Sequence, residues 1–345
     1  MIVQDWRDAA PGYVQPLYER EQHHWLDAFS WDTRARWSEV EQARLTGTLP
    51  GLIAFDRTGR VQGWSFHLTG AGVVHIDTLV ASSPAATAVL LNGVLEAAGD
   101  AEAVSCFIPT RAPLLADALE RRGFAVEPYL YLVRDNTDAI SDAVRPLDPS
   151  PDLSADLSRR SGEEAKAEAR SAKAESVIVD QWQESDLRSA ATLLRTAYGG
   201  VSSQHFAPGD TLAEWEQYAR NLVQGNETFD RGTTCVARRR EDSLAGLLLV
   251  SRIAGDTAHI AQLALAPSAR GQGLAARLLD ESCRRARAAG VTRMTLLVGA
   301  SNHAARSLYK SRNFSERAMF IAARRVGTRD TAFGLFSAPE ACMLS

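Results

Sequence analysis

Two stretches of the chain combine residue types and spacings that suit anion binding and proton transfer. The first, "ARGQGLA" (269–275), lies between the apolar run "HIAQLAL" and the helix-like "ARLLDESCRRARAA". Gly271 and Gly273 have no Cβ, so the backbone there can approach an anion closely. Amides that open a helix point at such a ligand, the helix dipole favours negative charge, and Arg270 adds a charge-assisted contact. The pattern indicates a bound phosphate or pyrophosphate.

A dinucleotide, a nucleoside triphosphate and coenzyme A all carry such a group. Residues 271–276 fit the dinucleotide spacing G-x-G-x-x-G/A, but that site also needs an acidic residue at the end of the next strand, and "LLVGASN" has none. A triphosphate loop needs Gly-Lys-Ser/Thr, whereas Leu274 follows Gly273. Coenzyme A is the reading that remains.

The second stretch is "NHAARSLYKSRNF" (302–314), which contains Asn302 and Tyr309. Together with Arg270-Gly271-Gln272-Gly273-Leu274-Ala275 it resembles the GNAT superfamily of acyl-CoA-dependent N-acyltransferases, over roughly residues 177–326. One departure is Asn313, where the family usually has Gly. Asn tolerates the left-handed conformation that a helix exit requires, so the departure is compatible with the motif.

The resemblance implies a site for acetyl-CoA. It places Tyr309 beside the cofactor sulfur as the general acid, because a phenol with a pKa near 10 can protonate a thiolate whose thiol has a pKa near 8.5. A half-buried helix aromatic is the structural alternative for Tyr309, and an N-cap the alternative for Asn302. No metal is expected, because the paired His23 and His24 diverge on a helix. The residues implied to bind the cofactor are Leu263, Leu265, Arg270, Gly271, Gln272, Gly273, Leu274, Ala275 and Asn302.

The general base that would deprotonate the amine is left open. A Glu in or near the fourth strand often serves in this family, but the strand here offers His259 and Gln262 and no carboxylate. His259 can accept a proton near neutral pH, although His75 matches it in the first half, which favours a scaffold role. The segment between the first two helices, which normally forms the acceptor site, and the start of the second helix contribute His205, Asp210 and Glu214.

The elements that position these residues occur twice. "HIDTLVASSPAATAVLLNGVL" from His75 aligns without gaps with "HIAQLALAPSARGQGLAARLL" from His259, and "ALERRGF" pairs with "LYKSRNF". Three segments in the same order at nearly constant offset indicate an internal duplication. Residues 137–176 are polar and almost free of aromatic residues, which is typical of a linker. We therefore expect two domains, 1–136 and 177–345.

Periodicity in the second half predicts strands and helices in the order of a mixed α/β fold, a sheet covered by helices. The predicted strands are 176–182, 233–239, 244–253, 258–265, 293–300 and 317–326, and the predicted helices 185–198, 211–225, 274–289 and 302–312. The expected architecture is two tandem GNAT-like domains.

The gapless alignment places apolar or small residues of the first half where the second has its motifs. Ala86, Thr87, Val89 and Leu91 stand opposite Arg270, Gly271, Gly273 and Ala275, while Ala112 and Leu119 stand opposite Asn302 and Tyr309. The first half is therefore expected to keep the fold without binding coenzyme A. Trp31, Trp37 and Trp64 are expected in its core.

Composition bounds the partners. A net charge of −4 and a pI near 6.0 argue against a general nucleic-acid binder. The N-terminus has no apolar signal core, and no apolar run is long enough to cross a bilayer, so we expect a cytoplasmic protein without a membrane partner. Cys106, Cys235 and Cys283 lie in apolar or helical runs and are expected to be buried free thiols. The oligomeric state is expected to be a monomer or a homodimer.

The expected function is transfer of an acetyl or other small acyl group from acetyl-CoA to the amine of a small molecule. Two alternatives remain. One is a non-catalytic protein that senses coenzyme A or binds a partner, a reading that the missing carboxylate supports. The other is an enzyme that acetylates protein lysines, because a fold alone does not identify the acceptor.

Overall fold

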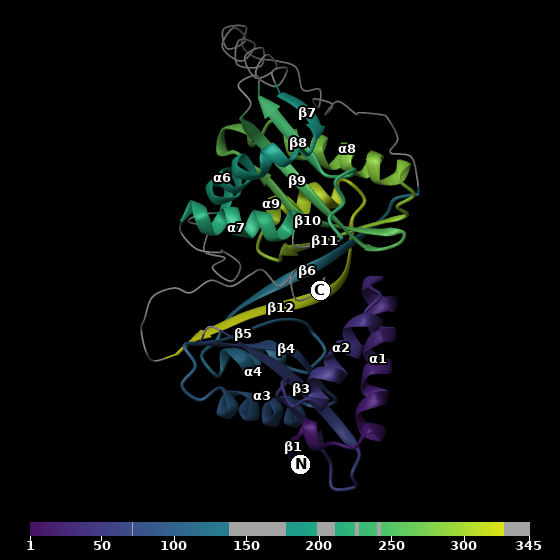
Figure 1. Cartoon of the computed structure of the whole chain (residues 1–345), viewed down its shortest axis with the longest axis vertical. Helices are drawn as coiled ribbons and strands as arrows, with labels where there is room; N and C mark the ends of the chain where they lie inside the picture. Colours follow the sequence, from purple (N-terminus) through teal and green to yellow (C-terminus); the bar gives the residue numbers. More distant parts are fainter. Residues whose placement is uncertain (71, 138–176, 199–210, 225–227, 240–242, 328–345) are drawn as a thin grey trace, which may run out of the picture.

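The computed structural model describes residues 1–70, 72–137, 177–198, 211–224, 228–239 and 243–327. The predicted linker therefore lies outside the described residues from residue 138 to its end at 176. Figure 1 shows the two halves of the chain one above the other, with two long strands crossing between them. No helix in the described ranges is both long and apolar enough to span a membrane.

The first half begins with a short edge strand and a pair of helices that precede the main strands. In chain order its elements are β1 (Ile2–Asp5), η1 (Trp6–Asp8), α1 (Pro11–Phe29), α2 (Arg34–Leu45), β2 (Gly51–Phe55), β3 (Val61–Gly70), β4 (Val73–Ala81), α3 (Pro84–Ala98), β5 (Ala103–Pro109), α4 (Leu115–Glu120) and β6 (Ala125–Asp135).

The second half repeats this order of elements, and its strands and helices are those predicted from periodicity to within a few residues at each end. They are β7 (Val177–Gln181), η2 (Glu184–Asp186), α6 (Leu187–Tyr198), α7 (Leu212–Val223), β8 (Cys235–Arg239), β9 (Leu244–Ala254), β10 (Thr257–Leu265), η3 (Pro267–Ala269), α8 (Leu274–Ala288), β11 (Arg293–Gly299), α9 (His303–Lys310) and β12 (Ser315–Val326).

The pairing of strands confirms the duplication. In each half three antiparallel pairings, which join four strands, are followed by one parallel pairing, β4 with β5 and β10 with β11. In both copies the fourth strand has a register shift at one residue, Asp77 in β4 and Ala261 in β10. The chain therefore contains two tandem copies of one mixed α/β fold.

The parallel pair in each copy is hydrogen-bonded over only four residues. The β10–β11 ladder ends at Ile260 and Leu296, although β10 continues to Leu265 and β11 to Gly299. Beyond that point the two strands are not paired with each other, although β10 stays paired with β9 and β11 with β6, so the edge of β10 that faces β11 is open to a ligand. The β4–β5 ladder ends in the same way, at Ile76 and Cys106.

The two halves exchange their last strands. All twelve strands lie in one sheet in the order β1-β2-β3-β4-β5-β12-β6-β11-β10-β9-β8-β7. β6 of the first half therefore pairs with β11 of the second, and β12 of the second pairs with β5 of the first. β6 and β12 also pair with each other, and they are the two strands that cross the middle of Figure 1. Each half is completed by a strand of the other.

The exchange is reinforced by the end of α1, which packs against strands of both halves. Trp25 and Phe29 join Tyr131 of β6 and Phe320 of β12 in one buried cluster. Trp31 donates its indole N–H to the Tyr131 hydroxyl at 3.0 Å. Trp31, Trp37 and Trp64 are all buried, which confirms the prediction that they belong to the core.

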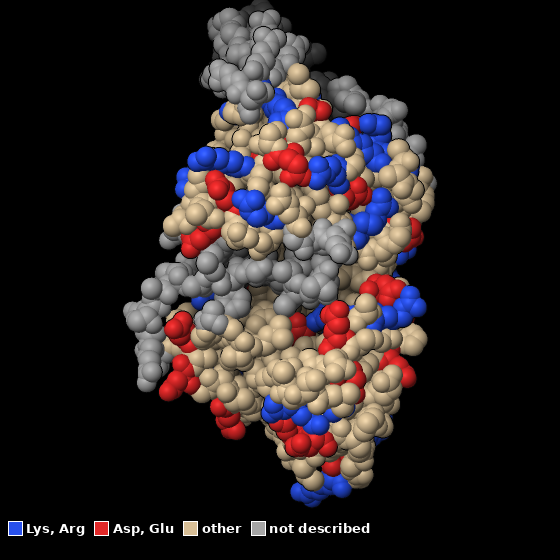
Figure 2. Space-filling model, in the orientation of Figure 1, with Lys and Arg blue, Asp and Glu red and all other residues tan. Residues whose placement is uncertain are grey.

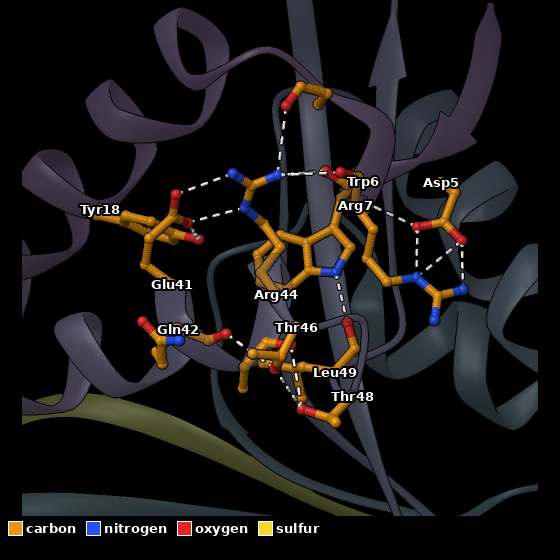
Figure 3. A network of polar contacts seen from close by, with 12 residues as sticks. Asp5, Trp6, Arg7, Tyr18, Glu41, Gln42, Arg44, Thr46, Thr48 and Leu49 are labelled. Atoms are coloured by element: carbon orange, nitrogen blue, oxygen red, sulfur yellow. Dashed lines mark hydrogen bonds and ion pairs between the residues drawn. The ribbon is translucent and has the colours of Figure 1, made fainter.

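A buried arginine of α2, paired with a partly exposed glutamate of the same helix, anchors α2 to the start of the first half (Figure 3). Both nitrogens on one edge of the Arg44 guanidinium lie 2.8 Å from the carboxylate of Glu41. Its remaining nitrogen donates to the carbonyl of Trp6 at 3.1 Å and to that of Ala9 at 3.3 Å. Because Arg44 is only 2% exposed, its charge depends on these partners.

Candidate functional site

The glycine loop has an open geometry that only glycine adopts without strain. Gly271 and Gly273 have φ of +71° and +72°, and a Cβ built on either one would meet no atom within 4 Å. Gly273 is also the N-cap of α8, and no side chain caps this helix. The loop therefore leaves free space in front of an uncapped helix N-terminus.

The amides that face this space are not used by the protein itself. In the ranges that the structure describes, the backbone N–H groups of residues 271–275 donate to no backbone carbonyl outside the helix. Such donors, at the positive end of a helix dipole, form an anion site. Two cationic side chains lie at the loop: Arg270 donates to the carbonyl of Ala197 at 3.3 Å, and Arg239 to the hydroxyl of Ser268 at 2.6 Å. The sequence did not predict that Arg239 lies at the loop.

The first half has no counterpart of this loop, and here the gapless alignment is wrong. β4 matches β10 at an offset of 257 − 73 = 184, but α3 matches α8 at 274 − 84 = 190. The strand-to-helix connection is thus two residues in the first half (82–83) and eight in the second (266–273). The anion loop is an insertion of six residues rather than a set of substitutions.

The start of α3 is closed in other ways as well. The hydroxyl of Ser83 caps the helix by accepting from the Ala86 amide at 3.2 Å, and Pro84 at the first helical position has no N–H to offer. Asp77, at the register shift of β4, forms an ion pair with Arg36, and both side chains are largely buried. The equivalent residue in the second half is the small Ala261.

Tyr309 lies on α9, is buried, and packs against Phe314 with ring centroids 5.8 Å apart. Burial raises the pKa of its phenol, and the nearby Tyr198 phenol raises it further. Tyr309 therefore stays protonated around neutral pH and can donate a hydrogen bond to a thiolate, although the same shift makes its phenol a weaker acid than a free one. In the first half Leu119 occupies this position and is fully buried.

Tyr198, at the end of α6, joins this arrangement although the sequence did not single it out. Its hydroxyl donates to the carbonyl of Leu263 at 3.1 Å, on the part of β10 that β11 leaves unpaired. It also interacts electrostatically with Tyr309. The part of β10 that β11 does not pair with thus accepts a hydrogen bond from a phenol of α6, and that phenol interacts electrostatically with the phenol of α9.

Asn302 caps α9, since its side-chain oxygen accepts from the amide of Ala305 at 3.1 Å. The structural alternative for this residue is therefore realised, and contact with a cofactor stays a prediction. The helix exit is as expected: Asn313 has φ of +62°, and Gly123 has φ of +79° at the same place in the first half.

The residues considered as a general base are occupied with structural roles or lie outside the described residues. His259 is buried, and its Nδ1 lies 2.9 Å from the Thr295 hydroxyl. Burial lowers the pKa of His259 to about 4, so it is neutral at pH 7 and a weak base. His75 lies 3.0 Å from Ser105 at the matching place, which supports the scaffold role.

The other described candidates for a general base also make structural hydrogen bonds. Gln262 donates to the hydroxyl of Tyr218 at 2.7 Å. Glu214 forms the predicted capping box of α7 with Thr211, and its carboxylate accepts a hydrogen bond from the Thr211 amide at 2.9 Å. His205 and Asp210 lie outside the described residues. The sequence-predicted candidates therefore include no described carboxylate free to deprotonate an amine.

A cavity of about 540 Å³ lies along α9, beside the start of β12 and β6. None of the residues predicted to bind the cofactor lines it; the lining residues are Leu132, His303, Arg306, Ser307, Lys310, Phe314, Ser315 and Glu316.

On the face shown in Figure 2, acidic and basic side chains are interspersed over the described residues of both halves. Within the described ranges no cluster of three or more His, Cys, Asp or Glu side chains is arranged to hold a metal ion. Cys106, Cys235 and Cys283 are buried free thiols, as predicted.

Comparison with known proteins agrees with this geometry. Residues 195–314, which contain both motifs, match the acetyltransferase (GNAT) family. A solved GCN5-related N-acetyltransferase from Sphaerobacter thermophilus is 16% identical, with a TM-score of 0.55 over 82% of each chain. A GCN5-related glucosamine N-acetyltransferase region of a fungal multi-domain GH3 β-N-acetylglucosaminidase is 14% identical, with a TM-score of 0.54 over 94% of this chain and 38% of that one. These likenesses show the fold. No curated protein matches the chain.

Proposed function

Since the chain is a tandem GNAT-fold protein whose residues 195–314 match the acetyltransferase family, we propose that it is an N-acyltransferase. It transfers an acetyl or other small acyl group from the coenzyme A thioester to the amine of a small molecule. The observation that carries this proposal is the uncapped glycine loop of α8 together with the buried, protonated Tyr309, both in the second half.

Different residues of the second half hold different parts of the coenzyme A thioester. The amides of 271–275 and Arg270 hold the pyrophosphate, which needs no rearrangement because the space before α8 is already open. The unpaired backbone around Leu263 and Leu265, with Asn302, positions the pantetheine arm. Acetyl-CoA supplies the activated acyl group as a thioester.

Tyr309 donates the proton that the leaving sulfur needs. General acid catalysis of this kind contributes roughly 10²- to 10⁴-fold to a rate. Holding the amine beside the thioester supplies the further advantage of proximity. The first half binds no coenzyme A, because its strand-to-helix connection is too short to form the loop and Ser83 caps the helix.

Calorimetric titration of the purified chain with acetyl-CoA tests the proposal first. We expect one site per chain and no binding to Gly273→Glu, whose carboxylate enters the anion site. A panel of amino sugars, polyamines, arylalkylamines and a lysine peptide is then screened by release of free thiol, with Tyr309→Phe as the inactive control. Absence of binding at millimolar acetyl-CoA would overturn the proposal, and turnover of the lysine peptide alone would redirect it to protein substrates.

A further inference from the structure

The proposed reaction needs a group to take a proton from the amine. A primary amine is a cation at neutral pH and attacks a thioester only after deprotonation. β10 carries no carboxylate, and His259 is buried and bonded to Thr295. The strand exchange brings a different strand to the site, because the neighbour of β11 is β6 of the first half.

β6 carries a carboxylate at the open end of β11. Gly299, the last residue of β11, pairs with Tyr129 of β6. Glu127 lies two residues before Tyr129, and because the strands are antiparallel it extends past the end of β11. A Cβ built on Gly299 would lie 3.2 Å from Oε1 of Glu127 and 4.0 Å from Cε1 of Tyr129. The Glu127 carboxylate therefore lies over the glycine at which β11 ends, where β10 and β11 are no longer paired.

Glu127 and Tyr309 approach this place from opposite faces of the sheet. Leu130 and Leu132 of β6 pack in the cluster that contains Tyr309 and α8, whereas Tyr129 packs with the end of α1 on the other face. Side chains alternate along a strand, so Glu127 shares the face of Tyr129. This is also the face on which α6 and α7 pack.

Electrostatic interactions of the Tyr198 phenol link the two faces. The Tyr129 hydroxyl lies 3.3 Å from Oε2 of Glu127 and donates to it. Tyr198 interacts electrostatically with both Tyr129 and Tyr309, and it bonds the unpaired β10 backbone at Leu263. Glu127, through Tyr129, and Tyr309 are thus both coupled to Tyr198, which is bonded to β10 beyond the end of the β10–β11 ladder.

The first half provides an internal comparison through the register of its own exchanged strand. Pro109, the counterpart of Gly299, pairs with Phe320 of β12. Phe320 thus occupies the position of Tyr129, and Ala318, two residues before it, that of Glu127. The half without the anion loop has apolar residues at both positions, whereas the half with the loop has a phenol and a carboxylate.

We propose that Glu127, delivered from the first half by strand exchange, is the general base of the acyl transfer in the second half; this rests on the proposed N-acyltransferase function. Glu127 takes one proton from the ammonium group and passes it to water. The nitrogen–carbon bond then forms and the carbon–sulfur bond breaks, with the electron pair leaving on sulfur. Sulfur receives a proton from Tyr309, and the second proton lost by nitrogen restores the phenol.

The surroundings of Glu127 suit this role. Burial raises the pKa of its carboxyl above the usual range, which makes it a stronger base, while the hydrogen bond from Tyr129 acts in the opposite direction. Among the described residues Tyr129 is the titratable group that contacts it, so no cation of the described chain holds it ionised.

Glu127→Gln tests the proposal without changing the size of the side chain. With the best amine of the panel we expect its kcat to fall about 100-fold, with an unchanged Kd for acetyl-CoA. The pH profile should also change: kcat/KM of the variant should rise tenfold per pH unit toward the pKa of the amine, where the native enzyme levels off. Glu127→Asp, which keeps the charge, should recover part of the rate.

Glu316→Gln is the matched control, because Glu316 is an exposed carboxylate on β12 that pairs with Arg306; we expect native kinetics. Native kcat and pH profile in Glu127→Gln would overturn the role of Glu127 and leave the acyltransferase proposal standing. A native chain that fails to bind acetyl-CoA would instead overturn the proposed function. If Glu127→Gln lowered the melting temperature, the rate and pH profile of Glu127→Asp would decide between a base and a structural residue.

Discussion

Substituting Gly271 by alanine separates the strain of the glycine loop from its function. Gly271 has φ of +71° and an open space where a Cβ would lie. Gly290, at the other end of α8, has φ of +78° and equally open surroundings. The two alanine variants therefore introduce the same backbone strain at opposite ends of one helix, and only the first lies in the anion site.

The effect on stability should be small and equal. A left-handed alanine costs about 1–2 kcal/mol, and the smaller entropy of the unfolded chain offsets up to about 1 kcal/mol. With an unfolding entropy of about 2.1 cal/mol/K per residue, a net loss of about 1 kcal/mol in a chain of 345 residues lowers the melting temperature by only about 1–2 °C. Both variants should therefore be folded at 25 °C.

The effect on binding should differ between the variants. A methyl group at position 271 displaces the phosphate from at least one amide, and a hydrogen bond to a charged group contributes about 1.5–3 kcal/mol. We expect the Kd for acetyl-CoA, measured by calorimetry, to rise about 10- to 150-fold in Gly271→Ala and to stay unchanged in Gly290→Ala. Equal, native affinity in both variants would refute the assignment of the loop as the anion site.

Three further predictions concern the scaffold. Arg44→Met should lower the free energy of unfolding in urea by about 3 kcal/mol, because it removes the ion pair with Glu41 and the hydrogen bonds of the buried guanidinium to three backbone carbonyls; a loss below about 1 kcal/mol would contradict the role of this pair. The pKa of His259 falls from 6.5 to about 4 on folding, so the stability that it contributes is present above pH 6.5 and is lost as the pH falls toward 4. Thermal melts of His259→Gln should accordingly show a weaker dependence on pH over this range than those of the native chain, and an unchanged dependence would exclude His259 as its source. Cleavage at a protease site placed within residues 138–176 should leave two fragments that co-elute in gel filtration, because β6 and β12 hold each fragment to the other; separation without denaturant would contradict the exchange.

The elements of the second half could be predicted because each is specified locally. Apolar periodicity gives the strands, Thr211 and Glu214 form the capping box of α7, and Asn313 adopts the positive φ expected at the exit of α9. The exchange of β6 and β12 could not be predicted in this way. Both are apolar strands that end a copy of the repeat, and no local signal states which of two equivalent edges each will join.

The loop before α8 has the open, uncapped geometry that its residue types predict, while the roles of the loop and of Tyr309 stay predictions. Where the site depends on the register of distant strands, the sequence could not predict it. The gapless alignment pairs the loop with Ala86–Leu91, because two apolar helices can be matched at several offsets. The observed ends of β4 and β10 and the starts of α3 and α8 show instead that the second half has six additional residues. The sequence does not reveal Glu127 as a candidate base, because Glu127 lies in the first half and no local pattern places β6 beside β11. The comparison of Glu127 with Ala318 requires the pairing of β11 with β6 and of β5 with β12.

The exchange of strands also sets the order in which the chain can acquire its structure during synthesis. β5 is made early, but the strand that covers its edge ends at Val326 and emerges from the ribosome after every other described strand. Until then the nascent first half presents an open sheet edge and a spare strand, β6, that has no partner within its own half. Folding of the two copies is thus a single late event governed by contacts distant in sequence. Two nascent chains in the same polysome could satisfy the same edges by pairing with each other, so intertwined dimers are the misfolded product that this architecture favours.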